Sequence, residues 1–585
     1  MTTGGAATVV CGRPGERPGR PHPYRTIWRK LAALMTPERR WTAAACIAAG
    51  ALSLPVVAII WIAGSGNEVA GVASVWPHLA STVLPTALTN SLLLMAGTGA
   101  MTLVIGTATA WLVTMHRFPG RDMADRLLVL PLAMPTYIVA YAYTELLDFA
   151  GPVQTAWRTW LNVGNPSQYA FPQIRSLGGA MTMMALVLYP YVYLAARASF
   201  EQQSVCVLEV ARTLGRTAAQ TFWAVALPLA RPALAAGVVL VAMETLNDLG
   251  AVQYLGVETL SASIYATWLQ RASLPGAAQI SLVMLALIVA LLVAEKALRG
   301  NGGFQATTGR YRAIPFETLD GGRAVLALVV VLLPSVLGFF VPFALLATQA
   351  VAHLATVDVS AFLRAARNSV LLAGVVSLVA ISFAVVFAYA VRFSGSRAAR
   401  TSSAAASLGY AMPGTVLAIG LISSLAAFDN GLDAWLRATF SISTGLLLSG
   451  SLFAVVFALV VRFLAVALGS VETGLQRISP NLDAAARTLG AGGMTTLMRI
   501  HLPILAPALG AAALLVFVDT MKELPATLLL RPFNFETLAT HVFGLTAAEQ
   551  FDEAALGAVA IVLIGLIPVM WLHRAVSEGR AGSRN

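Results

Sequence analysis

Four carboxylates lie in stretches of the chain that are otherwise apolar, and they form two matching pairs. Glu244 and Asp248 are four residues apart, and Asp519 and Glu523 repeat that spacing later in the chain. Residues four apart share one face of a helix, and acids within a long apolar segment usually face a cavity or one another. Carboxylate oxygens are hard ligands that suit a highly charged cation such as Fe(III). The pairs therefore predict an acidic passage through the protein.

A second set of oxygen ligands follows a helical spacing. Tyr137, Tyr141 and Glu145 are each four residues apart, so they form one stripe on a helix face, and we expect them to assist the acids. Two structural alternatives stay open. The acids can be solvated at helix ends, and the tyrosines can belong to an aromatic belt at the membrane surface. Lys522 also stands close enough to neutralise an acid, and the spacing identifies no resident metal site.

The elements that position these residues are predicted to be membrane-spanning helices. The chain is 58% hydrophobic and 11% charged, with a mean hydropathy of +0.76, so it lacks the polar surface that a water-soluble protein of this size needs. Segments of the roughly 20 residues needed to cross a bilayer lie near 41–63, 88–115, 124–147, 177–197, 229–250, 277–295, 324–352, 369–391, 402–427, 446–468, 508–530 and 555–573. The fold class is thus an all-α membrane protein with twelve transmembrane helices.

The net charge of +11 could point to nucleic acid, but the placement of the charges indicates topology. With the basic N-terminal tail inside the cell, about 29 of the 38 Lys and Arg residues fall on the cytoplasmic side, which is the positive-inside bias. We therefore expect a multi-pass membrane protein with both termini cytoplasmic. Nucleic acid is not expected as a partner.

The twelve segments form a 6+6 internal repeat. Asn90-Ser91 matches Asn368-Ser369, and Ala133-Met134-Pro135 matches Ala411-Met412-Pro413, in each case 278 residues later. Because six is an even number, both copies have the same orientation, a parallel duplication about an axis along the membrane normal. The predicted organisation is a cytoplasmic tail (1–40), a first transmembrane domain (41–299), a cytoplasmic linker (300–322), a second transmembrane domain (323–576) and a C-terminal tail (577–585).

A polar segment on the cytoplasmic side of each half is also duplicated. Ala211-Arg212-Thr213-Leu214-Gly215 recurs as Ala486-Arg487-Thr488-Leu489-Gly490, 275 residues later, and Leu227-Pro228 recurs as Leu502-Pro503. The glycine permits the turn that ends a short helix, and the proline interrupts the next helix at the membrane surface. Two copies of one surface predict a partner that grips both.

This segment resembles a known motif. Glu209-Val210-Ala211, then Gly215 and Leu227-Pro228, is similar to the EAA loop of the membrane subunits of binding-protein-dependent ABC importers. The second copy departs from the motif, because Ala484 stands where the family has its glutamate and the acid Asp483 comes one position earlier. The docking residues that the resemblance implies are Glu209, Ala211, Arg212, Gly215, Leu227 and Pro228, with Asp483, Ala486, Arg487, Gly490, Leu502 and Pro503.

The runs Met243-Glu244-Thr245-Leu246-Asn247-Asp248 and Lys522-Glu523-Leu524-Pro525-Ala526-Thr527 resemble the fused permeases of the ferric-iron uptake family. The resemblance implies a protein of the bacterial inner membrane with a type I ABC importer permease fold in each half. It also implies two copies of an ATPase subunit as partners inside, and a periplasmic or lipid-anchored solute-binding protein outside. Fused permeases for thiamine or polyamines share this architecture, and a 6+6 secondary transporter is a less favoured alternative.

The chain itself is not expected to hydrolyse ATP. A phosphate-binding loop needs Gly-Lys-Ser/Thr after a Gly-rich turn, and the three lysines, Lys30, Lys296 and Lys522, follow Arg, Glu and Met. The sequence has no nucleophile–base pair and no His/Cys cluster, so we predict no catalytic residues and no cofactor.

Overall fold

The computed structural model describes residues 37–65, 75–165, 168–202, 215, 217–299, 317–476 and 478–578. These parts are almost entirely helical. One exception is a short parallel pair in which β1 (His116–Arg117) lies beside β2 (Glu317–Thr318). The pair joins the end of the second crossing to the segment that begins the second half.

The first half contains long helices joined by short helical turns. Its helices are α2 (Pro37–Leu52), α3 (Leu54–Ser65), α4 (Trp76–His78), α5 (Leu84–Met115), α6 (Arg121–Leu127), α7 (Thr136–Leu147), α8 (Pro152–Leu161), α9 (Leu177–Gln202), α11 (Ala218–Thr221), α12 (Leu227–Asn247), α13 (Gly250–Tyr254), α14 (Leu260–Leu269) and α15 (Leu274–Arg299), with π-helical turns η1 (Leu79–Val83) and η4 (Phe222–Ala226) and the 3-10 turn η2 (Leu130–Ala133).

The second half repeats this order. Its helices are α16 (Gly322–Ser335), α17 (Val341–Ala352), α18 (Val359–Ser394), α19 (Arg397–Ser407), α20 (Gly414–Phe440), α21 (Leu452–Gln476), α22 (Pro480–Thr488), α23 (Gly493–Thr496), α24 (Leu502–Met521), α25 (Pro525–Leu530), α26 (Leu538–Ala547) and α27 (Phe551–Glu578), with π-helical turns η5 (Val336–Phe340) and η7 (Leu497–His501) and the 3-10 turn η6 (Leu408–Ala411).

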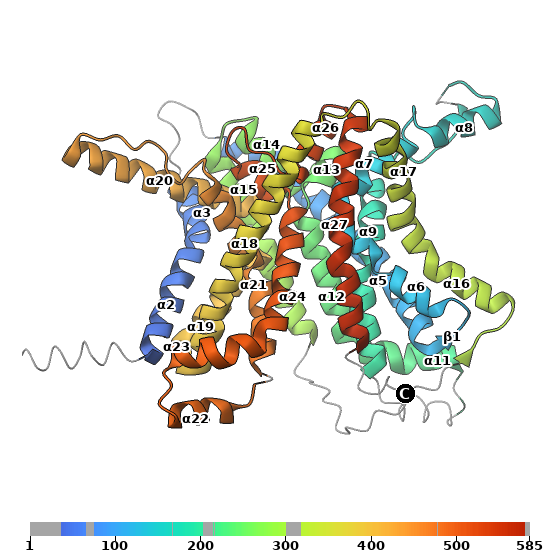
Figure 1. The fold of residues 1–585 in the computed structure, drawn as a ribbon. Helices are drawn as coiled ribbons and strands as arrows, with labels where there is room; N and C mark the ends of the chain where they lie inside the picture. Colours follow the sequence, from blue (N-terminus) through green and yellow to red (C-terminus); the bar gives the residue numbers. More distant parts are fainter. Residues whose placement is uncertain are drawn as a thin grey trace, which may run out of the picture.

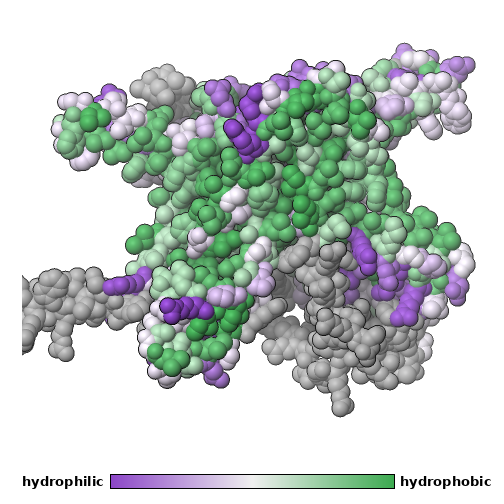
Figure 2. Space-filling model, viewed as in Figure 1, coloured by the Kyte–Doolittle hydropathy of each residue, from purple (hydrophilic) through white to green (hydrophobic). Residues whose placement is uncertain are grey.

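Eleven helical stretches of the described chain are long and apolar enough to cross a bilayer, and a bent pair of helices makes the twelfth. Six of these crossings precede the linker and six follow it. On the face shown in Figure 2, hydrophobic residues form a band across the middle of the molecule, and hydrophilic residues gather toward its two ends. The predicted all-α membrane fold with a 6+6 repeat is therefore confirmed.

The third crossing of each half differs from the straight span predicted at 124–147 and 402–427. In the first half, Arg121–Ala133 and Thr136–Leu161 meet at 96°. A 3-10 turn and then Met-Pro separate the two parts in both halves, and Met134 and Met412 have extended backbone. The residue before a proline disfavours the α conformation, so the repeated Met-Pro pair breaks the helix at the same point twice.

The first and last crossings of each half pack against the other half. From the first half, α2 and α3 contact α18, α19 and α20, and α15 contacts α20. From the second half, α16 contacts α5 and α6, α17 contacts α7, and α27 contacts η2. One hydrophobic core joins α5, α7 and α9 with α16, α17 and α27, and the other joins α18, α20 and α21 with α2, α3 and α15. The boundaries 41–299 and 323–576 stay a prediction about the repeat, and in space the two halves interlock.

Glycines permit the closest of these exchanged contacts. A Cβ atom on Gly420 of α20 would lie 2.2 Å from the carbonyl oxygen of Pro55 in α3, and one on Gly338 of η5 would lie 2.2 Å from the carbonyl oxygen of Leu186 in α9. Such distances are far below van der Waals contact. The interlocking therefore depends on backbone approach at these two positions.

The two ends of the molecule carry different elements. At one end, here called the α22 end, lie α6, α11, α19, α22 and α23, and at the opposite α26 end lie α8, α13, α14, α25 and α26 (Figure 1). The helices α8 and α20 project sideways from the body near the α26 end. Residues 300–316 of the predicted linker lie outside the described residues.

Candidate functional site: an acidic cavity between the two halves

A cavity of about 140 Å³ lies where α12 and α24 end, next to the two Met-Pro breaks. Both halves contribute to its wall, as the matching positions of the repeat predict. Five of the seven residues proposed for a passage line it, namely Tyr137, Glu244, Asp248, Asp519 and Glu523. The acids are therefore gathered in one place although their pairs are 275 residues apart in the sequence.

The helix that carries the first acid pair ends between its two members. The expected span 229–250 stops at Asn247, Asp248 has extended backbone, and the short helix α13 begins at Gly250. Asp248 accepts a hydrogen bond of 2.8 Å from the backbone N–H of Ala251 and another from the hydroxyl of Thr136. Asp248 thus caps α13 and ties it to the start of α7, while Glu244 stays on α12 beside the cavity.

The second acid pair is divided in the same way. The helix α24 ends at Met521 rather than near 530, and Glu523 precedes α25. The carboxylate of Glu523 accepts hydrogen bonds from the backbone N–H of Ala526 at 2.8 Å and of Thr527 at 3.0 Å, and from the Thr527 hydroxyl at 2.6 Å. The prediction that both acids of a pair lie on one continuous helix is therefore wrong. The second acid of each pair, Asp248 or Glu523, instead caps the next short helix.

Two cations that belong to the second half neutralise its acids. Arg462 of α21 donates from Nη1 to Oε1 of Glu523 at 3.0 Å, and Nζ of Lys522 lies 3.0 Å from Oδ1 of Asp519. Sequence reasoning missed Arg462. Its signal was a single arginine inside the apolar segment 446–468, where an ionisable residue indicates a functional or paired position.

One position of the repeat serves the acids differently in each half. In the first half Thr136 donates its hydroxyl to Asp248, whereas the equivalent residue in the second half is Gly414. A Cβ on Gly414 would lie 2.8 Å from Nη1 of Arg462 and 2.9 Å from Oε1 of Glu523. The missing side chain therefore makes room for the arginine that replaces the threonine as donor.

Tyrosines complete the cavity wall. The hydroxyl of Tyr137 is buried and has no hydrogen-bond partner among the described residues, and Tyr191 and Tyr410 also line the cavity. Tyr410 lies close to Glu244. An unpartnered buried hydroxyl costs free energy unless a ligand or water satisfies it, so Tyr137 indicates a polar occupant.

The rest of the predicted tyrosine stripe lies elsewhere. Tyr141 donates to Oε1 of Gln349 at 2.8 Å and is also 3.0 Å from the carbonyl oxygen of Phe551, whose ring stacks on it. Glu145 is half-buried and does not line the cavity. The expectation that Tyr141 and Glu145 join the acids at the cavity is therefore corrected, because neither lines it and Tyr141 packs against α17 and α27.

The second duplicated polar segment forms α22 and the turn after it, at the α22 end of the molecule (Figure 1). Arg487 and Leu489 are exposed, whereas Asp483 and Ala486 point inward and are buried. Gly490 has a φ of +75°, a conformation that glycine adopts at little cost. This side of the segment presents an accessible helical knob.

The acid of this segment is an internal group and does not face outward. Asp483 lies 2.9 Å from Nη2 of Arg392 and 2.8 Å from Nε2 of His501, and the hydroxyl of Tyr389 lies 2.6 Å from Nδ1 of His501. His501 is fully buried. Asp483 therefore fixes α22 to α18 and η7, which corrects its expected place among the contact residues.

The first copy of the segment is described in part. Glu209, Ala211 and Arg212 lie outside the described residues, whereas Gly215 has a φ of +80°, like Gly490. Leu227 and Leu502 each begin a long helix after a π-helical turn. Pro228 and Pro503 lack an N–H to donate. The two prolines therefore mark π-helical turns and do not end their helices.

Comparison with known proteins places this geometry in a family. Residues 102–347 match the family described as binding-protein-dependent transport system inner membrane component. The chain is 31% identical over 206 residues to a sulfate transport system permease protein of Escherichia coli, which covers 34% of this chain and 71% of that protein. The chain belongs to this family of inner membrane permeases.

The matches that span most of the chain are to permeases named for ferric iron. The permease is 25% identical over 491 residues to an Fe(3+)-transport system permease protein of Haemophilus influenzae, covering 83% of this chain and 89% of that protein. It is 23% identical over 508 residues to a ferric transport system permease protein of Actinobacillus pleuropneumoniae, covering 82% of this chain and 69% of that protein. The resemblance to fused ferric-iron permeases is thereby confirmed.

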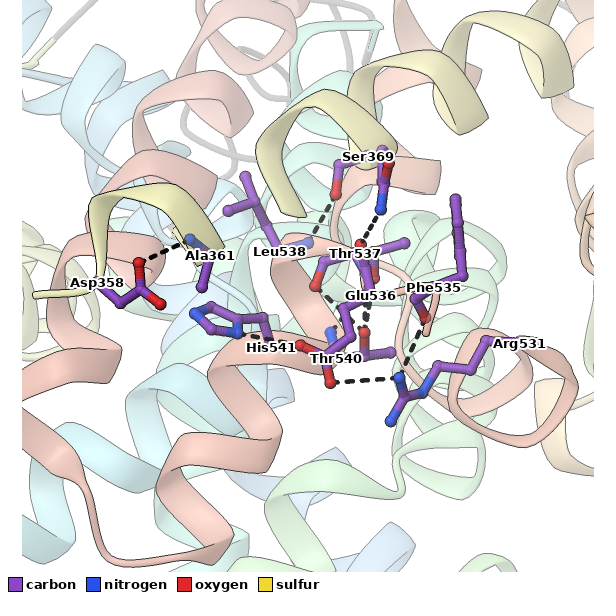
Figure 3. Close-up of polar contacts among 11 residues, drawn as sticks. Asp358, Ala361, Ser369, Arg531, Phe535, Glu536, Thr537, Leu538, Thr540 and His541 are labelled. Atoms are coloured by element: carbon purple, nitrogen blue, oxygen red, sulfur yellow. Dashed lines mark hydrogen bonds and ion pairs between the residues drawn. The ribbon is translucent and has the colours of Figure 1, made fainter. Parts of the chain in front are cut away.

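The permease also repeats a clamp near its α26 end. Nδ2 of Asn90 donates to the carbonyl oxygen of Glu258 at 3.0 Å, and Nδ2 of Asn368 donates to that of Glu536 at 3.0 Å. The backbone N–H of Leu260 donates to Ser91, and that of Leu538 donates to Ser369 (Figure 3). The matching Asn-Ser pairs thus hold the starts of α14 and α26.

In the second half further polar contacts surround this clamp. Glu536 lies 3.3 Å from Nη1 of Arg531 and 3.2 Å from Nδ1 of His541 (Figure 3). Nearby, hydrogen bonds from the Ser360 hydroxyl and from the backbone N–H of Ala361 hold the pKa of Asp358 below its ordinary value. Asp358 thereby caps α18 as a carboxylate.

Proposed function

We propose that this permease imports ferric iron as the membrane subunit of an ATP-driven importer, and that the acidic cavity is part of its translocation path. The observation that carries the proposal is the convergence of Glu244, Asp248, Asp519 and Glu523 from corresponding places of the two halves. The ferric names of relatives that match more than four-fifths of the chain support iron as the cargo.

The first-half acids are the stronger ligands in this proposal. Asp519 and Glu523 form ion pairs with Lys522 and Arg462, whereas Glu244 and Asp248 have no ion-pair partner among the described residues. Asp248 is engaged in capping α13. Glu244, which lines the cavity and caps no helix, is therefore the carboxylate that we expect to meet the cargo. Tyr141 and Glu145 are left out of the path because neither lines the cavity.

The α22 end is proposed to bind the ATPase. One copy would engage α22 through the exposed Arg487 and Leu489, and a second copy would engage the equivalent segment around Glu209 and Arg212. This assigns the α22 end and both termini to the cytoplasm, and the α26 end to the solute-binding protein. Closure of the ATPase dimer would bring the two segments together and rock one half against the other, which opens the cavity outward.

Substitution of Glu244 tests the path. Glu244→Gln removes the charge and keeps the shape, so we expect iron uptake into proteoliposomes containing the complete transporter to fall at least about tenfold, as expected for one lost charge-assisted contact. The matched variant Asp519→Asn, whose acid is paired with Lys522, should have a smaller effect. ATPase association should be unchanged in both. Wild-type uptake by Glu244→Gln would contradict the proposed path.

A second candidate cargo follows from Arg462 and Lys522. Permeases named for sulfate and for molybdenum match about a third of the chain, and two cations in a cavity suit an oxyanion. The same proteoliposomes should therefore be offered sulfate, molybdate, thiamine and a polyamine. Import of one of these in place of iron would replace ferric iron as the cargo, and vanadate inhibition would distinguish ATP-driven import from gradient-driven transport.

A further inference from the structure

The charges of the cavity are less symmetric than its acids. Both halves supply two carboxylates, but at two positions the second half has a cation where the first half has a neutral residue. Arg462 corresponds to Val187 and Lys522 corresponds to Asn247, and all four residues line the cavity. The duplication of the acids alone does not account for these two cations.

Glu523 does not depend on Arg462 to satisfy its carboxylate. It accepts two backbone N–H groups and one hydroxyl besides the guanidinium, which together fill most of the acceptor sites of a carboxylate. The guanidinium in turn has five N–H donors, of which Nη1 is engaged with Glu523 among the described residues. Arg462 therefore keeps donors for another anion in the cavity.

Lys522, like Arg462, is available to a further anion in the cavity. Its ammonium and the carboxylate of Asp519 are each about a third exposed, and both residues line the same cavity as Arg462. An exposed pair of this kind is held weakly. A ligand with anionic oxygens can therefore compete for Lys522 at low cost.

The cavity combines an excess of acids with two cations. Four carboxylates, one guanidinium and one ammonium sum to two negative charges when all are ionised, so the cavity as a whole attracts a trivalent cation. Its two cations repel that ion at short range but attract anionic oxygens bound to it. Among the described residues no group of three or more His, Cys, Asp or Glu side chains has the arrangement to hold a metal ion.

We infer that the cavity takes ferric iron together with an anionic oxygen ligand, such as phosphate or a hydroxycarboxylate, and that the pair moves as one species. Glu244 faces the metal side of this complex, and Arg462 and Lys522 face the oxygens of the anion. Compensation of the metal charge by its own ligands also lowers the cost of bringing it into the membrane interior. The inference rests on the proposed function, since it specifies the form in which iron is carried.

Double-label uptake tests this directly. Proteoliposomes with the permease, its ATPase and its binding protein are given ⁵⁵Fe(III) with either ³²P-phosphate or ¹⁴C-citrate, and both labels are counted inside. We expect one of the two anions to enter with iron in a constant ratio. Entry of iron without either anion would overturn the inference and leave the proposed function standing. Entry of an anion without iron, or of neither label, would contradict the proposed function itself.

Variants that carry the first-half residue at the equivalent second-half position test the role of each cation. Arg462→Val and Lys522→Asn install the residues found at the equivalent positions, and we expect each to lower anion-coupled iron uptake at least about fivefold. Arg462→Lys keeps a cation and should retain most of it, which separates charge from folding. Gly510→Ala, which lies outside the cavity at a position where a Cβ meets no atom within 4 Å, should leave uptake and the ratio of anion to iron unchanged. An unaltered ratio and rate in Arg462→Val would contradict a role for this cation.

Discussion

At the residue scale, the cavity shows how one position of a repeat can take on different tasks. Thr136 donates to Asp248 in the first half, and its counterpart Gly414 leaves space for Arg462 to reach Glu523 in the second. In each half, the acid that caps a short helix near the Met-Pro break, Asp248 or Glu523, therefore accepts several hydrogen bonds. The acids at 248 and 523 are therefore structural groups first, and Glu244 is the acid most available to a ligand.

Gly414→Ala should damage the second-half ion pair. The new methyl group would lie within 3 Å of Arg462, Glu523 and the backbone of Ala526, and overpacking of a tight site typically costs about 1–3 kcal/mol. We expect a lower melting temperature for the purified permease and slower iron uptake. Gly510→Ala is the matched control, because a Cβ there meets no atom within 4 Å. Equal melting temperatures for the two variants would show that the site can absorb the methyl group.

At the element scale, α22 is a short helix held from behind and exposed in front. Its buried side is tied to α18 and η7 through Asp483, Arg392 and His501, and its outer side presents Arg487 and Leu489. Nine residues are too few for a stable isolated helix, so the buried ion pair is what gives this element a fixed orientation.

Asp483→Asn and Arg487→Ala should therefore fail in different ways. Loss of Asp483 leaves Arg392 without its buried partner, which costs roughly 3–5 kcal/mol in such sites, so hydrogen exchange across residues 480–490 should accelerate in the purified permease. Arg487→Ala should leave exchange unchanged and weaken association with the ATPase. Slow exchange in Asp483→Asn would show that other contacts orient α22.

At the scale of the whole molecule, each hydrophobic core is built from both halves. The first and last crossings of one half complete the core of the other, with Gly338 and Gly420 at the closest contacts. Each half buries part of its apolar surface against helices of the other half, so the two halves form interlocked units. The rocking of one half against the other proposed for transport must therefore carry these exchanged helices with it.

A split permease tests this interlocking. Chains that end at Arg299 and begin at Glu317 should assemble when they are expressed together and copurify through a tag on one of them, because the contacts between the halves are noncovalent. Either chain expressed alone should aggregate or be degraded, since its exposed apolar area would be large. Recovery of a single half as a stable, monodisperse protein would contradict the shared cores.

The sequence by itself determined the membrane environment, the twelve crossings, the 6+6 repeat and most of the acids that line the cavity. Composition, hydropathy and repetition can be read along the chain, and a buried charge in an apolar segment is visible there. Only the tertiary structure decided that Arg462 meets Glu523, 61 residues away, and that Asp483 meets Arg392, 91 residues away. It also decided that Tyr141 packs against α17 and α27, that Glu145 does not line the cavity, and that the first crossings are exchanged. These outcomes depend on where helices break and how they cross, and both are set by packing between segments that hydropathy treats as equivalent.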